Sequence, residues 1–182
     1  NRRTKTFGPG RRNDTIGFRC CSDTMVDSGK VASLKRNESA EVGQPLPQIS
    51  LDTTDGKKWS TSMAKGKVTY LTFFASWCGS CKRELPELNQ WQKAFGKAGF
   101  EVVAVGVDRN PKQSENFANQ FEPVYPVALD PDAMTMGLFN INAMPTSFLV
   151  DRDGVIRHRE VGFKKDEVAL LQRKIQKLLE GK

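Results

Sequence analysis

Histidine and cysteine are scarce in this sequence of 182 residues, which contains one histidine, His158, and four cysteines. Four cysteines are too few for a protein that is held together by a framework of disulfides. They fall in two pairs, Cys20-Cys21 and Cys78-x-x-Cys81, and adjacent cysteines cannot easily bind the same tetrahedral ion. A zinc site would need all four thiols, so we expect no metal.

Long apolar runs are also lacking. No segment approaches the roughly 18 apolar residues of a membrane-spanning helix, and runs such as Val102–Val107 have the length of a strand. The sequence begins with Asn1 and shows no apolar core of a signal peptide, so we expect any targeting segment to have been removed or to lie outside it. Length and composition predict one globular domain with some additional sequence.

The excess of positive charge is confined to one end of the sequence. The formal net charge is +7, but residues 1–36 hold nine Lys and Arg against three acids, whereas residues 37–182 hold nineteen against eighteen. The terminal arginines are not interleaved with aromatic residues, as they would be on a surface that binds single-stranded nucleic acid. The pattern favours a solvated tail, and we expect no nucleic-acid partner.

Residues 1–40 are predicted to form an irregular basic segment, because they are rich in Arg, Asn, Asp, Ser and Gly and show little periodic hydrophobicity. The string Asp14-Thr15-Ile16-Gly17-Phe18-Arg19-Cys20 resembles the closing stretch of formylglycine-generating (sulfatase-modifying factor) domains. That resemblance implies that residues 1–28 are the remnant of an upstream domain. Cys20 and Cys21 leave three alternatives: a vicinal disulfide, two free thiols, or pairing with a lost upstream domain.

Residues 41–182 alternate between strand and helix patterns. Val68–Ala75 is a continuous apolar and β-branched run, which is typical of a strand buried on both faces. The helix that follows carries one apolar stripe, formed by Leu85, Leu88, Trp91 and Phe95. The other predicted elements are an N-terminal hairpin over Ile49–Ser60, strands at Val102–Val107, Val124–Leu129, Ser147–Val150 and Val155–Val161, and helices at Pro111–Gln120, Asp132–Phe139 and Asp166–Leu179. This order predicts an α/β fold with a mixed central sheet and helices on both faces.

The pair Cys78 and Cys81 lies where the buried strand ends and the helix begins. Free N–H groups and the positive end of the helix dipole favour an anion at the first cysteine. Because the thiolate is the attacking species in disulfide exchange, we predict that Cys78 is the nucleophile. Cys81 lies one helical turn further on and is predicted to resolve the mixed disulfide. Half of a zinc site has the same spacing, but the strand and helix on either side favour redox chemistry.

Three further features stand out: the motif Trp77-Cys78-Gly79-Ser80-Cys81, Pro86 within the predicted helix, and Met144-Pro145-Thr146 before a strand. By these features, residues 42–181 resemble the thioredoxin superfamily, and specifically its TlpA/ResA-like extracytoplasmic thiol-disulfide oxidoreductases, in which a proline kinks the active-site helix. The resemblance implies a thioredoxin fold in which Pro145 is cis and the backbone of Met144 pairs with a substrate. Trp77, Gly79, Ser80, Met144, Pro145 and Thr146 are the implied substrate-binding residues. Trp77 has two interpretations, a core residue or an aromatic shield beside the thiols.

Glu84 matches the acid that the ResA-like group places beneath its cysteines, whereas Thr72 replaces the buried Asp of cytosolic thioredoxins. Glu84 lies one helical turn from Cys81, so its carboxylate can face the same site. Desolvated there, it would have a raised pKa and would take the proton of Cys81 during exchange. The alternative is a solvated carboxylate beside Lys82 and Arg83.

The resemblance implies an enzyme that reduces disulfides in extracytoplasmic client proteins, receives electrons from a membrane-bound thiol reductase, needs no cofactor and is monomeric. A thiol peroxidase is one alternative, although Thr72-Phe73-Phe74-Ala75 has alanine where that site needs cysteine. A redox-inert interaction module is another, disfavoured because both cysteines are present. A disulfide-forming oxidant is a third, but Gly79-Ser80 is not the Pro-His dipeptide of strong oxidants. We interpret His158, between Arg157 and Arg159, as a surface residue.

Overall fold

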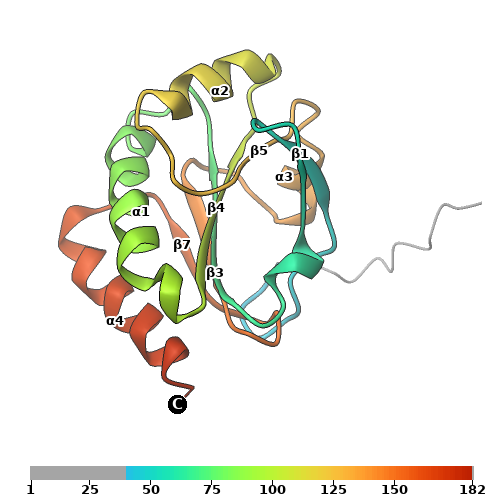
Figure 1. Cartoon of the computed structure of the whole chain (residues 1–182). Helices are drawn as coiled ribbons and strands as arrows, with labels where there is room; N and C mark the ends of the chain where they lie inside the picture. The colour runs from blue at the N-terminus through green and yellow to red at the C-terminus, as the bar shows by residue number, and fades with distance from the viewer. Residues whose placement is uncertain (1–39, 182) are drawn as a thin grey trace, which may run out of the picture. The chain divides into compact units, whose positions relative to one another are not determined.

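The computed structural model of the protein describes residues 40–181 (Figure 1). The predictions for Cys20, Cys21 and nearly all of the basic segment 1–40 lie outside this range. Within it, the strands are β1 (Ser50–Thr53), β2 (Lys58–Ser60), β3 (Val68–Phe74), β4 (Phe100–Gly106), β5 (Val127–Leu129), β6 (Thr146–Val150) and β7 (Ile156–Val161). The α-helices are α1 (Cys81–Phe95), α2 (Pro111–Asn119), α3 (Met134–Leu138) and α4 (Val168–Leu179), and short 3-10 helices cover Thr61–Ala64, Gly96–Ala98 and Lys165–Glu167.

The strands form one seven-stranded sheet in the order β2-β1-β5-β4-β3-β6-β7. β4 pairs in parallel with both β3 and β5, whereas the pairs β3 with β6, β6 with β7, β1 with β2 and β1 with β5 are antiparallel. The predicted mixed sheet with an N-terminal hairpin is therefore confirmed. β3 lies between β4 and β6, and every one of its residues is buried, as its apolar run predicts.

Helices cover both faces of this sheet, as predicted. Alternate residues of β3 point to opposite sides, so Tyr70 and Phe74 join a core with α1, α2 and α4, whereas Leu71 and Phe73 join a second core with Phe139 beside α3. Figure 1 shows α1 and α4 on one side of the strands and α3 on the other. No helix within the described range is long and apolar enough to cross a membrane.

Two elements are three residues shorter than their sequence pattern predicts, β5 and α3. β5 begins at Val127 because Pro126 has no N–H to donate to a neighbouring strand. α3 begins at Met134 because the Asp130 carboxylate accepts hydrogen bonds from the N–H groups of Met134 and Thr135 at 3.2 and 2.9 Å. Neither difference affects the order of the elements.

Candidate active site

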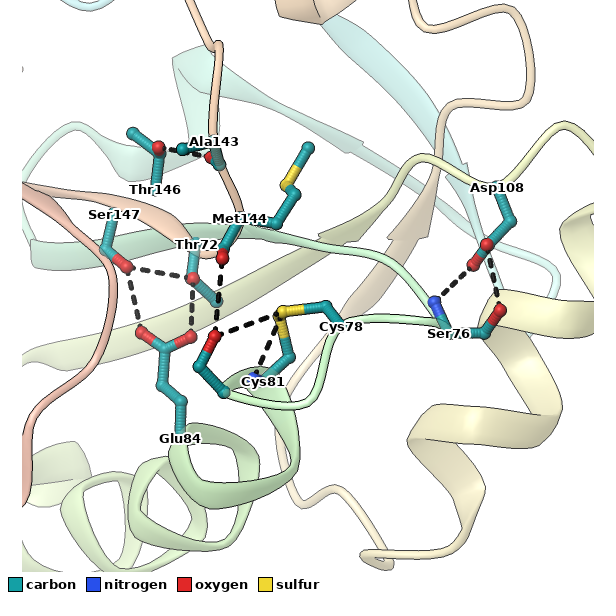
Figure 2. The surroundings of a disulfide bond; sticks show 11 residues. Thr72, Ser76, Cys78, Cys81, Glu84, Asp108, Ala143, Met144, Thr146 and Ser147 are labelled. Atoms are coloured by element: carbon teal, nitrogen blue, oxygen red, sulfur yellow. Dashed lines mark hydrogen bonds between the residues drawn. A yellow bond between two sulfur atoms is a disulfide. The ribbon is translucent and has the colours of Figure 1, made fainter.

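The cysteine pair occupies the junction between β3 and α1 (Figure 2). Cys78 and Cys81 form a disulfide with their Cα atoms 5.4 Å apart. Cys81 is the first residue of α1, and its N–H donates a hydrogen bond to the Sγ of Cys78 at 3.2 Å. Cys78 is 4% exposed and Cys81 is 0% exposed. The open N-terminus of the helix thus faces the sulfur of Cys78, where it favours negative charge.

Asp108 anchors the loop that precedes Cys78, a role that the sequence patterns did not reveal. Its buried carboxylate accepts hydrogen bonds from the N–H of Ser76 and from the hydroxyl of Ser76, both at 2.9 Å, and from the hydroxyl of Ser114 at 2.6 Å. Asp108 follows β4, and the carboxyl ends of the parallel strands β3 and β4 meet at one edge of the sheet. That adjacency is the signal that could have identified it.

Glu84 is fully buried beneath the cysteines, so the alternative of a solvated carboxylate is wrong. The hydroxyl groups of Tyr70 and Ser147 donate to its Oε1 at 3.1 and 2.8 Å, and that of Thr72 donates to its Oε2 at 3.0 Å. Burial raises the pKa of Glu84 to about 7, even though these hydrogen bonds lower it. Burial also raises the pKa of Tyr70 well above its ordinary value, so its hydroxyl remains a donor.

The hydroxyl oxygens of Thr72 and Ser147 also lie 2.9 Å from each other, which closes a ring with the carboxyl group of Glu84 (Figure 2). When Glu84 is protonated, the ring has three hydrogens for its three contacts, since the acid can donate to Thr72, Thr72 to Ser147, and Ser147 back to the acid. When Glu84 is ionised, both hydroxyls donate to the carboxylate and their mutual contact has no hydrogen. The ring therefore accommodates a neutral carboxyl group and can release its proton.

The loop Met144-Pro145-Thr146 lies across from the cysteines (Figure 2), and its Met144–Pro145 peptide bond is cis, as the resemblance implied. The carbonyl oxygen of Met144 accepts a hydrogen bond from the Ser80 hydroxyl at 3.3 Å. Thr146 is fully buried and its hydroxyl donates to the carbonyl oxygen of Ala143 at 2.7 Å, so its side chain shapes the loop and does not face solvent.

Trp77 and Gly79 are exposed beside the cysteines, and the Trp77 side chain is 74% exposed. The interpretation of Trp77 as a core residue is therefore wrong. His158 is only half-buried, as a surface residue would be, but its Nε2 lies 2.9 Å from both the Glu160 carboxylate and the Nζ of Lys174. Within residues 40–181, no three His, Cys, Asp or Glu side chains are grouped in a way that could hold a metal ion.

A redox-active cysteine pair at the start of a helix, after a buried central strand and opposite a cis-proline loop, defines a thioredoxin-fold thiol-disulfide oxidoreductase. Comparisons with known proteins lead to the same class of protein. The family model described as Redoxin matches residues 41–175. The chain belongs to the Redoxin family, and within the thioredoxin superfamily it is a TlpA/ResA-like member.

Individual relatives and solved structures support the same activity. The thiol-disulfide oxidoreductase ResA of Bacillus cereus is 30% identical over 125 residues, which cover 69% of this chain and 72% of the relative. ResA of Bacillus subtilis is 34% identical over 119 residues, 65% of this chain and 66% of the relative. The crystal structure of a putative thiol:disulfide interchange protein DsbE from Chlorobium tepidum has a TM-score of 0.74 and 36% identity, covering 78% of this chain and 99% of that one. The protein is a thiol-disulfide oxidoreductase that acts on disulfide-bearing substrates with a reductant partner.

Proposed function

We propose that the protein reduces disulfides of extracytoplasmic client proteins, with Cys78 as the nucleophile and Cys81 as the resolving cysteine. The observation that carries this assignment is the hydrogen bond from the N–H of Cys81 to the sulfur of Cys78 at 3.2 Å. A hydrogen-bond donor at the helix start stabilises a thiolate at Cys78 once the disulfide is reduced. Cys81, at 0% exposure, is accessible only to a sulfur already attached to Cys78.

The reaction transfers two electrons from the dithiol to the client. The thiolate of Cys78 attacks one sulfur of the client disulfide, which forms a mixed disulfide and releases a client thiolate. Cys81 then loses its proton and attacks the sulfur of Cys78, which releases the second client thiolate and forms the Cys78–Cys81 disulfide. The two client thiolates take up protons, and a dithiol reductant restores the enzyme.

Glu84 is proposed to accept the proton of Cys81 in the second step. It lies one helical turn from Cys81, and its carboxyl group is buried among three hydroxyls. A carboxyl group whose pKa is about 7 can both take up and release a proton near neutral pH. The hydroxyl ring keeps hydrogen bonds to the group in either state, so the proton can move without a change in packing.

The proposed client surface consists of the exposed Trp77 and Gly79, the half-buried Ser80, and the loop at Met144 and Pro145. Residues 41–182 are proposed to form a thioredoxin-like domain, with the irregular basic segment 1–40 outside it. A membrane-bound thiol reductase as electron donor, an extracytoplasmic location and a monomeric state are likewise proposals, supported by the resemblance to TlpA/ResA-like proteins.

The reduction potential of the Cys78–Cys81 pair tests whether the protein is a reductant. The full chain is equilibrated in glutathione or dithiothreitol redox buffers, and the dithiol fraction is counted by thiol alkylation and mass spectrometry. We expect a value more negative than the roughly −180 mV of protein disulfide isomerase and nearer to the roughly −270 mV of thioredoxin. A value near the roughly −120 mV of a strong oxidant would contradict reduction as the function.

A further inference from the structure

The hydroxyl group of Ser80 lies between two acceptors at the active site. Its Oγ is 3.5 Å from the Sγ of Cys78 and 3.3 Å from the carbonyl oxygen of Met144. Neither a disulfide sulfur nor a carbonyl oxygen carries a hydrogen, so Ser80 is the donor in both contacts. A hydroxyl has a single hydrogen, and the two acceptors therefore compete for it.

The outcome of that competition depends on the redox state of the cysteines. Sulfur in a disulfide is a weak acceptor, so the hydrogen of Ser80 serves the carbonyl of Met144 in the oxidised protein. A thiolate is charged, and hydrogen bonds to charged acceptors are roughly twice as strong as those between neutral groups. We propose that the Ser80 hydroxyl is a catalytic hydrogen-bond donor that leaves the Met144 carbonyl and turns to the thiolate of Cys78 when the disulfide is reduced.

This switch has a consequence at each acceptor. In the reduced protein, the Cys78 thiolate receives two donors, the N–H of Cys81 and the hydroxyl of Ser80. The carbonyl of Met144 is then free to accept a hydrogen bond from the backbone of a client. The reduced protein is the form that must bind an oxidised client. When the Cys78–Cys81 disulfide forms again, the hydroxyl returns to one of the two lone pairs of the Met144 carbonyl. An oxygen shared between two donors holds each of them less strongly, which favours release of the product.

The inference rests on the proposed role of Cys78 as the nucleophile, and the variants are chosen to separate the two claims. Ser80→Ala removes the hydroxyl, and Ser80→Thr keeps one at the same position. Ser62→Ala, at an exposed serine of the 3-10 helix Thr61–Ala64, is the matched control. These changes leave in place the ionisable groups of the adjoining elements, which are Lys82, Arg83 and Glu84 in the first turn of α1 and Asp108 against the loop at Ser76.

The first measurement is the rate at which iodoacetamide alkylates Cys78 in the reduced full chain between pH 5 and 9, followed by mass spectrometry of the peptides. Loss of a hydrogen bond to a charged group changes the thiolate-to-thiol ratio by about tenfold at a given pH. We expect Ser80→Ala to slow alkylation of Cys78 about tenfold on the acid side of the curve. Ser80→Thr is expected to stay within about threefold of the parent, and Ser62→Ala to match it.

The second measurement follows the carbonyl of Met144 by NMR. The dipeptide Met-Pro occurs once in the sequence, so ¹³C-carbonyl methionine combined with ¹⁵N-proline gives one coupled resonance, that of Met144. A carbonyl carbon is deshielded when its oxygen accepts a hydrogen bond. We expect the resonance of the parent to move upfield on reduction, and that of oxidised Ser80→Ala to lie near the value of the reduced parent.

The two results together decide the inference, whatever the behaviour of the threonine variant. A Met144 resonance that is the same in both redox states of the parent overturns the switch, and so does an unchanged rate of Cys78 alkylation in Ser80→Ala. If Cys78 in the parent reacts no faster than Cys81, the proposed nucleophile itself is wrong. If Cys78 reacts faster than Cys81 in the parent and equally fast in Ser80→Ala, only the role of Ser80 fails.

Discussion

The burial of Glu84 makes the stability of the protein depend on pH, and Glu84→Gln tests this directly. Burial raises the pKa of Glu84 from 4.5 to about 7 in the folded protein. At a pH between these two values, the Glu84 carboxyl group is ionised in the unfolded chain and still protonated in the folded protein. The contribution of Glu84 to the free energy of unfolding is therefore fully present below about pH 4.5 and is lost as the pH rises through about 7. The difference between the two pKa values of Glu84 corresponds to a change of about 3 kcal/mol in the free energy of unfolding, at about 1.4 kcal/mol for each pH unit.

The assay is urea denaturation of the oxidised full chain at steps between pH 4 and 8, followed by tryptophan fluorescence. Relative to the parent, Glu84→Gln should gain up to about 3 kcal/mol of unfolding free energy between pH 4.5 and 8, because the amide does not titrate. Glu87→Gln, on the same helix but only partly buried, controls for the loss of one carboxylate. Parallel curves for the parent and Glu84→Gln would refute the reasoning, since they would mean that Glu84 titrates alike in both states.

Three further predictions concern the rate of exchange and the anchoring of the loop. Glu84→Gln should slow the reduction of insulin by about tenfold in a stopped-flow assay, because the resolving thiol loses its proton acceptor; an unchanged rate would exclude that role. Deletion of residues 1–36 should leave insulin reduction and the melting temperature nearly unchanged, and a loss of more than about half the activity would show that the segment takes part. Asp108→Ala should lower the free energy of unfolding in urea by about 2 kcal/mol, because it leaves the partly buried N–H of Ser76 and the buried hydroxyl of Ser114 without an acceptor. Ser114→Ala, which leaves only the N–H of Asp108 without its acceptor, should cost about 1 kcal/mol. Equal losses would contradict the anchoring role.

The parts of the fold that were predicted correctly are those that local patterns determine. The apolar run of β3 and the stripe on α1 identify the central strand and the helix that carries Cys81. The cis Pro145 followed from the resemblance, since a proline in sequence alone does not report its isomer. β5 is shorter than predicted because a single proline outweighs the β-branched residues around it.

The parts of the site that escaped prediction depend on contacts between distant residues. Ser147 is 63 residues from Glu84, and Ser76 is 32 residues from Asp108. No local pattern marks a serine or threonine as the partner of a particular carboxylate, because these residues occur throughout loops and strands. Thr72 is an example. The sequence showed only that it replaces the buried Asp of cytosolic thioredoxins, whereas the structure places its hydroxyl against the carboxylate of Glu84.

The central claim is that Cys78 attacks the client disulfide and Cys81 resolves the intermediate, and trapping of the mixed disulfide tests it most directly. Cys81→Ser and Cys78→Ser variants of the full chain are mixed with insulin, and the products are separated by non-reducing electrophoresis and identified by mass spectrometry. We expect Cys81→Ser to accumulate a mixed disulfide through Cys78 and Cys78→Ser to accumulate little, because the helix start faces Cys78 and Cys81 is the more deeply buried of the two. Equal trapping by the two variants, or trapping by Cys78→Ser alone, would contradict the assignment.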